Sequence, residues 1–336
     1  MKRTAAILLL LALLAALGAC GAKPAAPGKT ASSEPTYRIG VAVYRFDDVF
    51  MTQYRAELES YFAQKETDEA KYDLTFYDAK NDPQVQQEQL RQMLSDGTDL
   101  IILNLVRTTD AESVISEITG KGVPLVLINR EPCSGDGVPF SALPTLPEGK
   151  YCYVGADARQ SGRFQGEILL AQPDHGDVNG DGVVSYIMLE GDPENVDARH
   201  RTEQSVAALT DAGYTVECLF DEVGNWEKEK GKQLCLTALR QYGDKAEVIF
   251  CNNDAMAIGA AEALAEQGRT VGRDVYLLGV DGLAECQKMV ELGTMTGTVL
   301  NDHIGQSHAA ADVAVRLLHG ESVEPFYWVD YVKVMR

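Results

Sequence analysis

The chain has 336 residues, of which 45% are hydrophobic and 24% are charged, and its net charge at pH 7 is −20. This acidic excess argues against a surface that binds nucleic acid and against a polybasic contact with a membrane. Without its amino-terminal segment the chain keeps roughly 300 residues, more than one hydrophobic core usually takes, so we expect two lobes.

The amino terminus is typical of a targeting segment. Two basic residues precede an apolar run, residues 5–17, that is short for a membrane span. The run closes on Leu17-Gly18-Ala19-Cys20, which resembles the lipobox cleaved by the bacterial lipoprotein signal peptidase. We expect residues 1–20 to be a lipoprotein signal peptide with Cys20 as the lipid-modified residue; the alternative is an ordinary secretory signal with a chance cysteine. Residues 21–36 lack an apolar period and predict a flexible tether.

Strand-like apolar runs then alternate with helical periods almost to the end of the chain. Strands are predicted at 38–44, 72–77, 99–105, 123–129, 151–154, 183–189, 214–220, 247–252 and 275–280. Helices are predicted at 84–94, 111–119, 197–211, 254–268 and 303–319, with a glycine at or near the usual stop position. This alternation predicts an α/β fold with parallel sheets and helices on both faces.

The loops after these strands carry no glycine-rich phosphate loop and no nucleophile elbow. They carry polar and aromatic side chains instead, at the carboxyl ends of strands, where open parallel sheets bind ligands. Carboxylate, amide and guanidinium groups pair with adjacent hydroxyls, and aromatic faces cover the C–H faces of a pyranose. Each residue alone could be a helix cap or a surface pair, but together they predict a sugar site. The set is Asp48, Phe50, Asn104, Asp192, Asp197, Arg201, Trp226, Asn252, Asn253, Asp254 and Asp281.

Residues 177–185 have the spacing of a calcium-binding loop, in which Gly182 permits the sharp turn. The candidate oxygen donors are Asp177, Asn179, Asp181, the carbonyl of Val183, and Ser185. An EF-hand would supply a bidentate glutamate where this chain has Met188, and residues 185–189 read as a strand and not as a second helix. The pattern predicts a structural Ca²⁺ loop between a helix and a strand that needs one carboxylate from elsewhere. A metal-free polar turn is the alternative.

Seven cysteines occur in the chain, and six remain when Cys20 is set aside. Their spread is not that of a disulfide-dense scaffold. Cys133 and Cys152, on either side of a loop rich in proline and glycine, are the one candidate pair, and free thiols are the alternative.

Residues 37 to about 333 resemble the bacterial galactose/glucose-binding proteins, within the type I periplasmic sugar-binding proteins. The matching stretches are 38–51, 104–106, 129–132, 153–155, the calcium loop, 252–257, 279–281 and 297–302. The resemblance implies two doubly wound parallel-sheet lobes joined by a hinge. The first lobe would comprise 37–124 and 303–332, and the second 125–302. The family has one more short segment after residue 336, so the third crossing between lobes is either incomplete or the sequence is truncated.

Carried over by position, the resemblance also implies roles for individual residues. The hydrogen-bonding groups for the sugar would be Asp48, Asn104, Asn195, Asp197, Arg201, Asn253, Asp281 and Asn301, with Phe50 and Trp226 as the stacking pair. Glu247 would be the remote bidentate Ca²⁺ ligand. Asn195 stands where the family has a histidine, which leaves the preferred hexose open, and Ser185 replaces a longer amide, so it could bind Ca²⁺ through a water.

The function implied is that of a lipid-anchored, extracytoplasmic, monomeric protein that captures D-galactose or D-glucose and delivers it to the permease of an ABC importer. No catalysis, no nucleic acid and no membrane contact beyond the anchor are expected. A sugar sensor that presents to a chemoreceptor or histidine kinase, and a site for another monosaccharide, are the alternatives. A hydrolase would need two carboxylates beside the scissile bond, for which Asp48 and Asp281 are candidates, and a regulator would begin with a DNA-binding motif.

Overall fold

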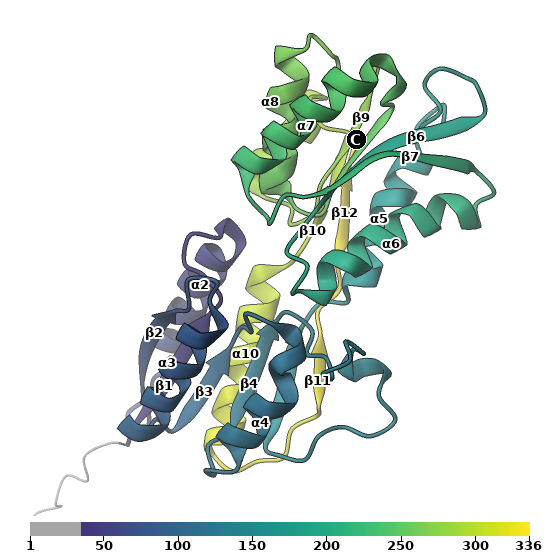
Figure 1. Ribbon diagram of the computed structural model, residues 1–336. Coiled ribbons are helices and arrows are strands. Elements are labelled where there is room, and N and C mark those ends of the chain that lie inside the picture. Colours follow the sequence, from purple (N-terminus) through teal and green to yellow (C-terminus); the bar gives the residue numbers. More distant parts are fainter. Residues whose placement is uncertain (1–34) are drawn as a thin grey trace, which may run out of the picture. The chain divides into compact units, whose positions relative to one another are not determined.

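The computed structural model describes residues 35–336, and the predicted signal peptide, Cys20 and nearly all of the predicted tether lie outside the described residues. Residues 36–336 form two lobes, each built on one six-stranded sheet (Figure 1). Within the described residues, no helix is both long enough and apolar enough to cross a membrane.

The sheet of the first lobe has the strand order β11-β5-β4-β3-β1-β2, and all of its strands are parallel. The strands are β1 (Thr36–Val43), β2 (Lys71–Asp78), β3 (Leu100–Leu103), β4 (Leu125–Asn129), β5 (Tyr151–Gly155) and β11 (Phe326–Trp328). Helices α2 (Val49–Lys65) and α10 (His303–Leu318) cover one face, and α3 (Pro83–Asp96) and α4 (Ala111–Thr119) cover the other. Side chains alternate between the faces, so Val41 contacts the α2–α10 core while Ala42 contacts the α3–α4 core.

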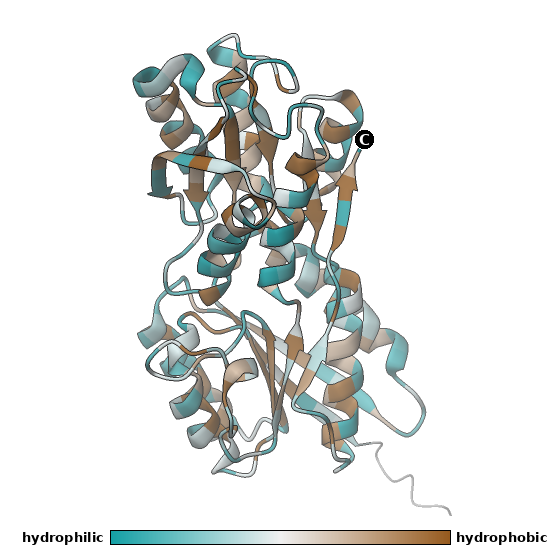
Figure 2. Cartoon of the chain, turned by 90° about the vertical axis from the view of Figure 1, so that its right-hand side faces the viewer, coloured by the Kyte–Doolittle hydropathy of each residue, from teal (hydrophilic) through white to brown (hydrophobic). Residues whose placement is uncertain are grey.

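The sheet of the second lobe has the strand order β12-β10-β9-β8-β6-β7. The strands are β6 (Val183–Glu190), β7 (Thr215–Val223), β8 (Val248–Cys251), β9 (Tyr276–Leu278), β10 (Gly297–Leu300) and β12 (Val332–Met335). Helices α5 (Ala158–Leu170) and α6 (Val196–Asp211) cover one face, and α7 (Lys228–Tyr242), α8 (Asp254–Glu266) and α9 (Ala284–Leu292) cover the other. Only β12 runs antiparallel to its neighbour, β10. Figure 2 shows the apolar strands of both lobes enclosed by helices with hydrophilic outer surfaces.

The predicted α/β fold of two doubly wound lobes is confirmed, but the expected boundary between the lobes is wrong. The second lobe was expected to begin at residue 125, whereas β4 and β5 belong to the first sheet. Residues 125–128 are fully buried, and β4 pairs in parallel with β3 on one side and β5 on the other. The chain therefore first crosses to the second lobe between β5 and α5.

Two further segments cross between the lobes, between β10 and α10 and between β11 and β12. The last crossing is held by hydrogen bonds from the Val329 amide to the Gly155 carbonyl (2.8 Å) and from the Tyr331 amide to Oε1 of Gln160 (2.8 Å). The crossing that the sequence left in doubt is therefore present. Cys133 and Cys152 are buried and both are free thiols.

Candidate functional site

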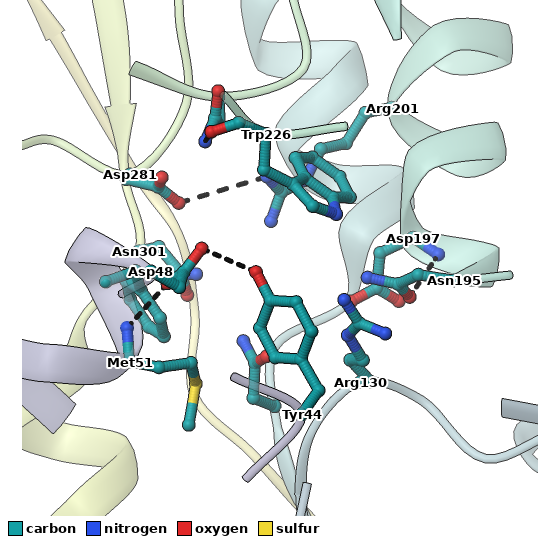
Figure 3. Close-up of a pocket in the computed structure, with 13 residues that line it drawn as sticks. Tyr44, Asp48, Met51, Arg130, Asn195, Asp197, Arg201, Trp226, Asp281 and Asn301 are labelled. Atoms are coloured by element: carbon teal, nitrogen blue, oxygen red, sulfur yellow. Dashed lines mark hydrogen bonds and ion pairs between the residues drawn. The ribbon is translucent and has the colours of Figure 1, made fainter. Parts of the chain in front are cut away.

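Loops from the carboxyl ends of strands in both sheets meet around one pocket (Figure 3). Its lining residues are Tyr44, Asp48, Phe50, Met51, Asn129, Arg130, Asn195, Asp197, Arg201, Trp226, Asn253, Asp281 and Asn301. Nine of the ten residues to which the resemblance assigns a role in sugar binding are in this lining, and Asn104 is the exception. Asp192, Asn252 and Asp254, which the pattern of strand ends also suggested, do not line it. The cavity volume is about 30 Å³, which is room for water but not for a hexose. A ligand of that size therefore requires the lobes or the lining side chains to move.

The first lobe contributes Asp48, which caps the amino terminus of α2. Its Oδ1 accepts from the Met51 amide at 2.7 Å, and its Oδ2 accepts from the Tyr44 hydroxyl at 2.6 Å. Burial raises the pKa of Tyr44 well above its usual value, so this phenol is a donor at neutral pH. Both carboxylate oxygens of Asp48 thus already have a protein donor in the pocket.

Asn104, the tenth predicted residue, does not line the pocket. It is fully buried, and its amide group donates to the Ile128 carbonyl (3.2 Å) and to Oδ1 of Asn129 (3.1 Å). Its Oδ1 accepts from the Tyr44 amide at 3.3 Å. Because these contacts use the amide, Asn104 supports the backbone and side chains of the lining and does not face a ligand.

The second lobe presents Asn195, Asp197 and Arg201 from the first turns of α6. Oδ1 of Asn195 caps the helix by accepting from the Asp197 amide at 3.0 Å, which leaves its NH₂ group as the part free to donate. Asp197 and Arg201, one helical turn apart, are both buried and face the pocket, so they are not a surface pair. Arg201 donates to the Asn252 carbonyl (2.6 Å) and to the Tyr331 hydroxyl (3.2 Å), and lies 3.9 Å from Oδ1 of Asp281.

Three lining residues at or just after the ends of β4, β7 and β9 have unusual backbone conformations. Asn129, Trp226 and Asp281 have φ values of 62°, 66° and 123°, a region that L-residues other than glycine rarely adopt. Such strain persists where the surroundings impose it, commonly at ligand sites. Gly191 is part of those surroundings, since a Cβ atom there would lie 2.0 Å from the Trp226 ring.

Helix α8 shows which of two neighbouring residues reaches the pocket. Asn253 is its cap, accepting from the Met256 amide at 3.0 Å, and it lines the pocket. Asp254 is the first helical residue and not the cap, and it is completely buried outside the lining. Its carboxylate accepts from the Leu283 amide (2.8 Å) and the Thr298 hydroxyl (2.6 Å), and so holds the loop that carries Asp281.

Three polar atoms in the described lining are buried without a hydrogen-bond partner: Oδ1 of Asp197, Nε of Arg201 and Nε1 of Trp226. Leaving such a group unpaired costs about 1–3 kcal/mol. Burial is the main cause that raises the pKa of Asp197 to about 7, while Arg201 opposes the shift. One acceptor and two donors thus converge on the pocket, a pattern that the hydroxyl groups of a neutral polyol satisfy.

Sequence reasoning missed four of the lining residues, namely Tyr44, Met51, Asn129 and Arg130. Tyr44 and Asn129 stand at or just after the ends of β1 and β4, so the rule that located the other residues would have included them. It also missed Tyr331, which holds Arg201 from the last crossing segment.

The predicted calcium loop lies at the start of β6, away from the pocket, and Glu247 faces it. Glu247 is buried, and its two oxygens accept from the amides of Asn179 (2.8 Å) and Ser185 (3.0 Å). Burial first, and then the carboxylates of Asp177 and Asp181, raise its pKa. The three carboxyl groups with the neighbouring amide, hydroxyl and carbonyl oxygens fit the donor set that Ca²⁺ takes.

The loop carboxylates are bonded to backbone amides in this structure. Asp177, for example, accepts from the amides of Gly180, Asp181 and Gly182 at 2.8–3.1 Å. Among residues 35–336, no three His, Cys, Asp or Glu side chains are already grouped as metal ligands. Binding a metal would therefore require these side chains to exchange amide partners for the ion.

Comparisons with known proteins agree with this architecture. The family model described as a periplasmic binding protein domain matches residues 39–322. The chain is 31% identical over 301 residues to the D-galactose/methyl-galactoside binding periplasmic protein of Haemophilus influenzae, covering 87% of this chain and 85% of that protein. It is 25% identical over 276 residues to the ribose import binding protein of Salmonella typhimurium, covering 82% and 84%.

A solved structure is similar over nearly the same span. It is an ABC transporter solute binding protein from Bacillus halodurans with bound myo-inositol, which has 25% sequence identity and a TM-score of 0.75. The match covers 90% of this chain and 96% of that one.

Proposed function

Because this chain belongs to the family of periplasmic binding proteins, we propose that it captures one small polyol, D-galactose or D-glucose, between its lobes and delivers it to an ABC importer. The observation that carries the proposal is the set of unpaired polar atoms on Asp197, Arg201 and Trp226 within a pocket that both lobes line. Closure around the ligand would shift an open–closed equilibrium, and the permease would bind the closed form.

The preference for a hexose over other polyols rests on relatives and on residue types. The two relatives described above are named for binding galactose and ribose, and the solved structure holds myo-inositol. All of these ligands carry adjacent hydroxyl groups. Such groups can pair with carboxylates and guanidinium groups, which Asp48, Asp281 and Arg201 would supply here. Galactose and glucose remain our first candidates because the relative named for galactose covers most of the chain at 31% identity.

We further propose that the protein is not an enzyme, that it is held outside the cytoplasm by a lipid on Cys20, and that Ca²⁺ stabilises the 177–185 loop. The relatives are named as binding proteins, which supports the first point. The lipobox-like sequence supports the second, and the convergence of Glu247 on the loop supports the third.

Calorimetry of the purified protein against a panel of D-galactose, D-glucose, D-ribose and myo-inositol tests the assignment. We expect galactose or glucose to bind with a stoichiometry of one ligand per chain. Binding of ribose or inositol without either hexose would move the assignment to another polyol. The absence of heat with every compound in the panel would contradict the proposed function.

A further inference from the structure

Arg130 is a buried cation that lines the ligand pocket and also contacts the other lobe. It directly follows β4 in the first lobe, and 1% of the residue is exposed. Its Nη1 donates to the carbonyls of Leu105 (3.2 Å) and Val106 (2.7 Å) of the same lobe. These carbonyls are neutral, so they hold the guanidinium in place without balancing its charge.

A carboxylate from the other lobe forms an ion pair with this charge. Nη2 of Arg130 lies 3.3 Å from Oδ2 of Asp192, which follows β6 of the second sheet. The two side chains are 1% and 8% exposed. Because each residue is anchored in a different sheet, separation of the lobes would break this pair and expose both charges to water.

The contacts of the pair extend into the ligand pocket in both directions. In the first lobe, the Arg130 guanidinium lies 3.7 Å from the centre of the Tyr44 ring, and the Tyr44 hydroxyl binds Asp48. In the second lobe, the carbonyl of Asp192 accepts from the amide of Asn195, the cap of α6, at 3.0 Å.

A backbone contact beside the pair joins the same two loops. The amide and the hydroxyl of Thr108 in the first lobe donate to the carbonyl of Glu194 in the second lobe at 3.2 and 3.3 Å. The loop at 191–195, which leads into α6, is therefore attached to the first lobe through both Asp192 and Glu194.

We propose that Arg130 and Asp192 form an interlobe pair that stabilises the closed form and thereby sets how long a bound ligand is retained. This inference rests on the proposed function. Asp192 acts as a positioning residue, since it does not line the pocket and acts through Arg130 and the loop at 191–195. Burial keeps water and salt away from the pair, so its loss should mainly change the dissociation rate.

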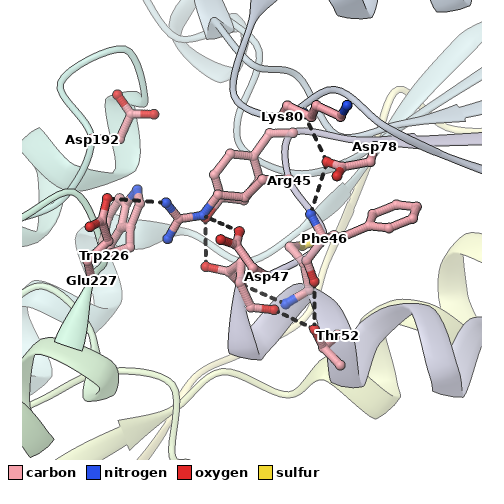
Figure 4. A network of polar contacts seen from close by, with 12 residues as sticks. Arg45, Phe46, Asp47, Thr52, Asp78, Lys80, Asp192, Trp226 and Glu227 are labelled. Carbon is pink, nitrogen blue, oxygen red and sulfur yellow. Dashed lines mark hydrogen bonds and ion pairs between the residues drawn. The ribbon is translucent and has the colours of Figure 1, made fainter. Parts of the chain in front are cut away.

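A second pair between the lobes provides a matched control. Arg45, after β1, lies 3.5 Å from Glu227, before α7, and also contacts Asp47 (Figure 4). Glu227 in turn contacts Lys230. The Glu227 side chain is 39% exposed. Pairs exposed to this extent contribute little because water and salt screen them. Asp192→Asn and Glu227→Gln therefore each remove one carboxylate from one interlobe pair, and only the first pair is buried.

The test is stopped-flow release of the hexose or polyol found by calorimetry, followed by tryptophan fluorescence in the full chain. Asp192→Asn should accelerate dissociation by about thirtyfold while the association rate changes little. Glu227→Gln should remain within about twofold of the unmodified protein. Equal effects of the two variants, or an unchanged dissociation rate in Asp192→Asn, would overturn the proposal.

The distance between spin labels placed on the two lobes provides a readout that needs no ligand. Asp192→Asn should shift ligand-free protein toward longer distances, and Glu227→Gln should not. This measurement also separates the two hypotheses: if no polyol binds, the proposed function fails, whereas an unchanged distance in Asp192→Asn contradicts the interlobe pair. If Asp192→Asn does not fold, Arg130→Lys, which keeps the charge but has fewer N–H donors, should show the same changes to a smaller degree.

Discussion

The Tyr44 hydroxyl donates to Oδ2 of Asp48 at 2.6 Å, so the predicted acceptor for a ligand hydroxyl is already bonded to a hydroxyl of the protein. The other oxygen of Asp48 accepts from the Met51 amide. A ligand hydroxyl at Asp48 must therefore displace the phenol from Oδ2 or share this oxygen with it. Tyr44 thus competes with ligand for Asp48 while its ring packs against Arg130.

Removing this competitor should strengthen binding. Tyr44→Phe keeps the ring and its contact with Arg130 but frees Oδ2 of Asp48. A hydrogen bond to a charged group is worth about 1.5–3 kcal/mol net, so we expect the affinity to rise by about tenfold or more where the ligand takes the place of the phenol. Calorimetry with the best hexose measures this. A weaker affinity in Tyr44→Phe would mean that the phenol itself bonds to the ligand.

Asp281→Asn should weaken ligand binding without unfolding the protein. Asparagine has the shape of aspartate and meets the same backbone strain at this position (φ 123°), but the variant loses the charge that faces Arg201 at 3.9 Å. A hydrogen bond to a charged group contributes about 1.5–3 kcal/mol, so the dissociation constant should rise by about tenfold or more. Asp47→Asn is the control, because the Asp47 side chain is 84% exposed and does not line the pocket.

The same variant tests for catalysis. A binding protein should leave aryl-galactosides and aryl-glucosides intact with either Asp281 or Asn at this position. Release of the aryl group by the unmodified protein, and its loss in Asp281→Asn, would favour a hydrolase that uses this carboxylate.

Binding and stability should depend on pH through Asp197. Burial raises the pKa of this carboxyl to about 7, with Glu131 adding to the shift and Arg201 opposing it. The folded protein then keeps a proton that the unfolded chain loses near its ordinary pKa of about 4. The contribution of Asp197 to stability is therefore greatest below pH 4 and falls as the pH rises from about 4 to about 7.

Ligand hydroxyls that donate to Asp197 favour its ionised form. Affinity should therefore rise between pH 5 and pH 8, and binding below pH 7 should release protons, which calorimetry in buffers of different ionisation enthalpy detects. Asp197→Asn should lose this proton release, bind more weakly and melt at a higher temperature at pH 8. A proton release that persists in Asp197→Asn would point to another group, such as Asp281, whose pKa burial also raises.

The sequence predicted the site residues correctly where they lie in the loop that follows a strand, as Asp48 and Trp226 do, because ligands bind at the carboxyl ends of parallel strands. It failed where long-range pairing decides the outcome. The apolar run at 123–129 predicts a strand but does not indicate which lobe the strand belongs to. Its pairing with β3 places it in the first sheet. Asn104 is a residue type that commonly binds hydroxyl groups, but its hydrogen bonds to Ile128 and Asn129 direct its side chain away from the pocket. The Arg130–Asp192 pair joins loops 62 residues apart, a contact that spacing alone cannot show.

Chelation of Ca²⁺ should destabilise the protein if the loop at 177–185 binds the ion. A metal that binds only the folded chain stabilises it by about 2.7 kcal/mol at a hundredfold excess over its dissociation constant. We therefore expect a chelator to lower the melting temperature and added Ca²⁺ to restore it.

Glu247 should be required for this response, because it faces the loop from the residue before β8 and would complete the oxygen donors of a bound ion. Glu247→Gln should melt at a low temperature with or without Ca²⁺ while still binding ligand in the cold, since the loop does not line the pocket. Glu217→Gln, on the neighbouring strand β7, removes an exposed carboxylate of the same lobe and should respond to Ca²⁺ like the unmodified protein. A melting temperature of the unmodified protein that neither chelator nor Ca²⁺ changes would show that the amide contacts of Glu247 and Asp177 form a metal-free turn.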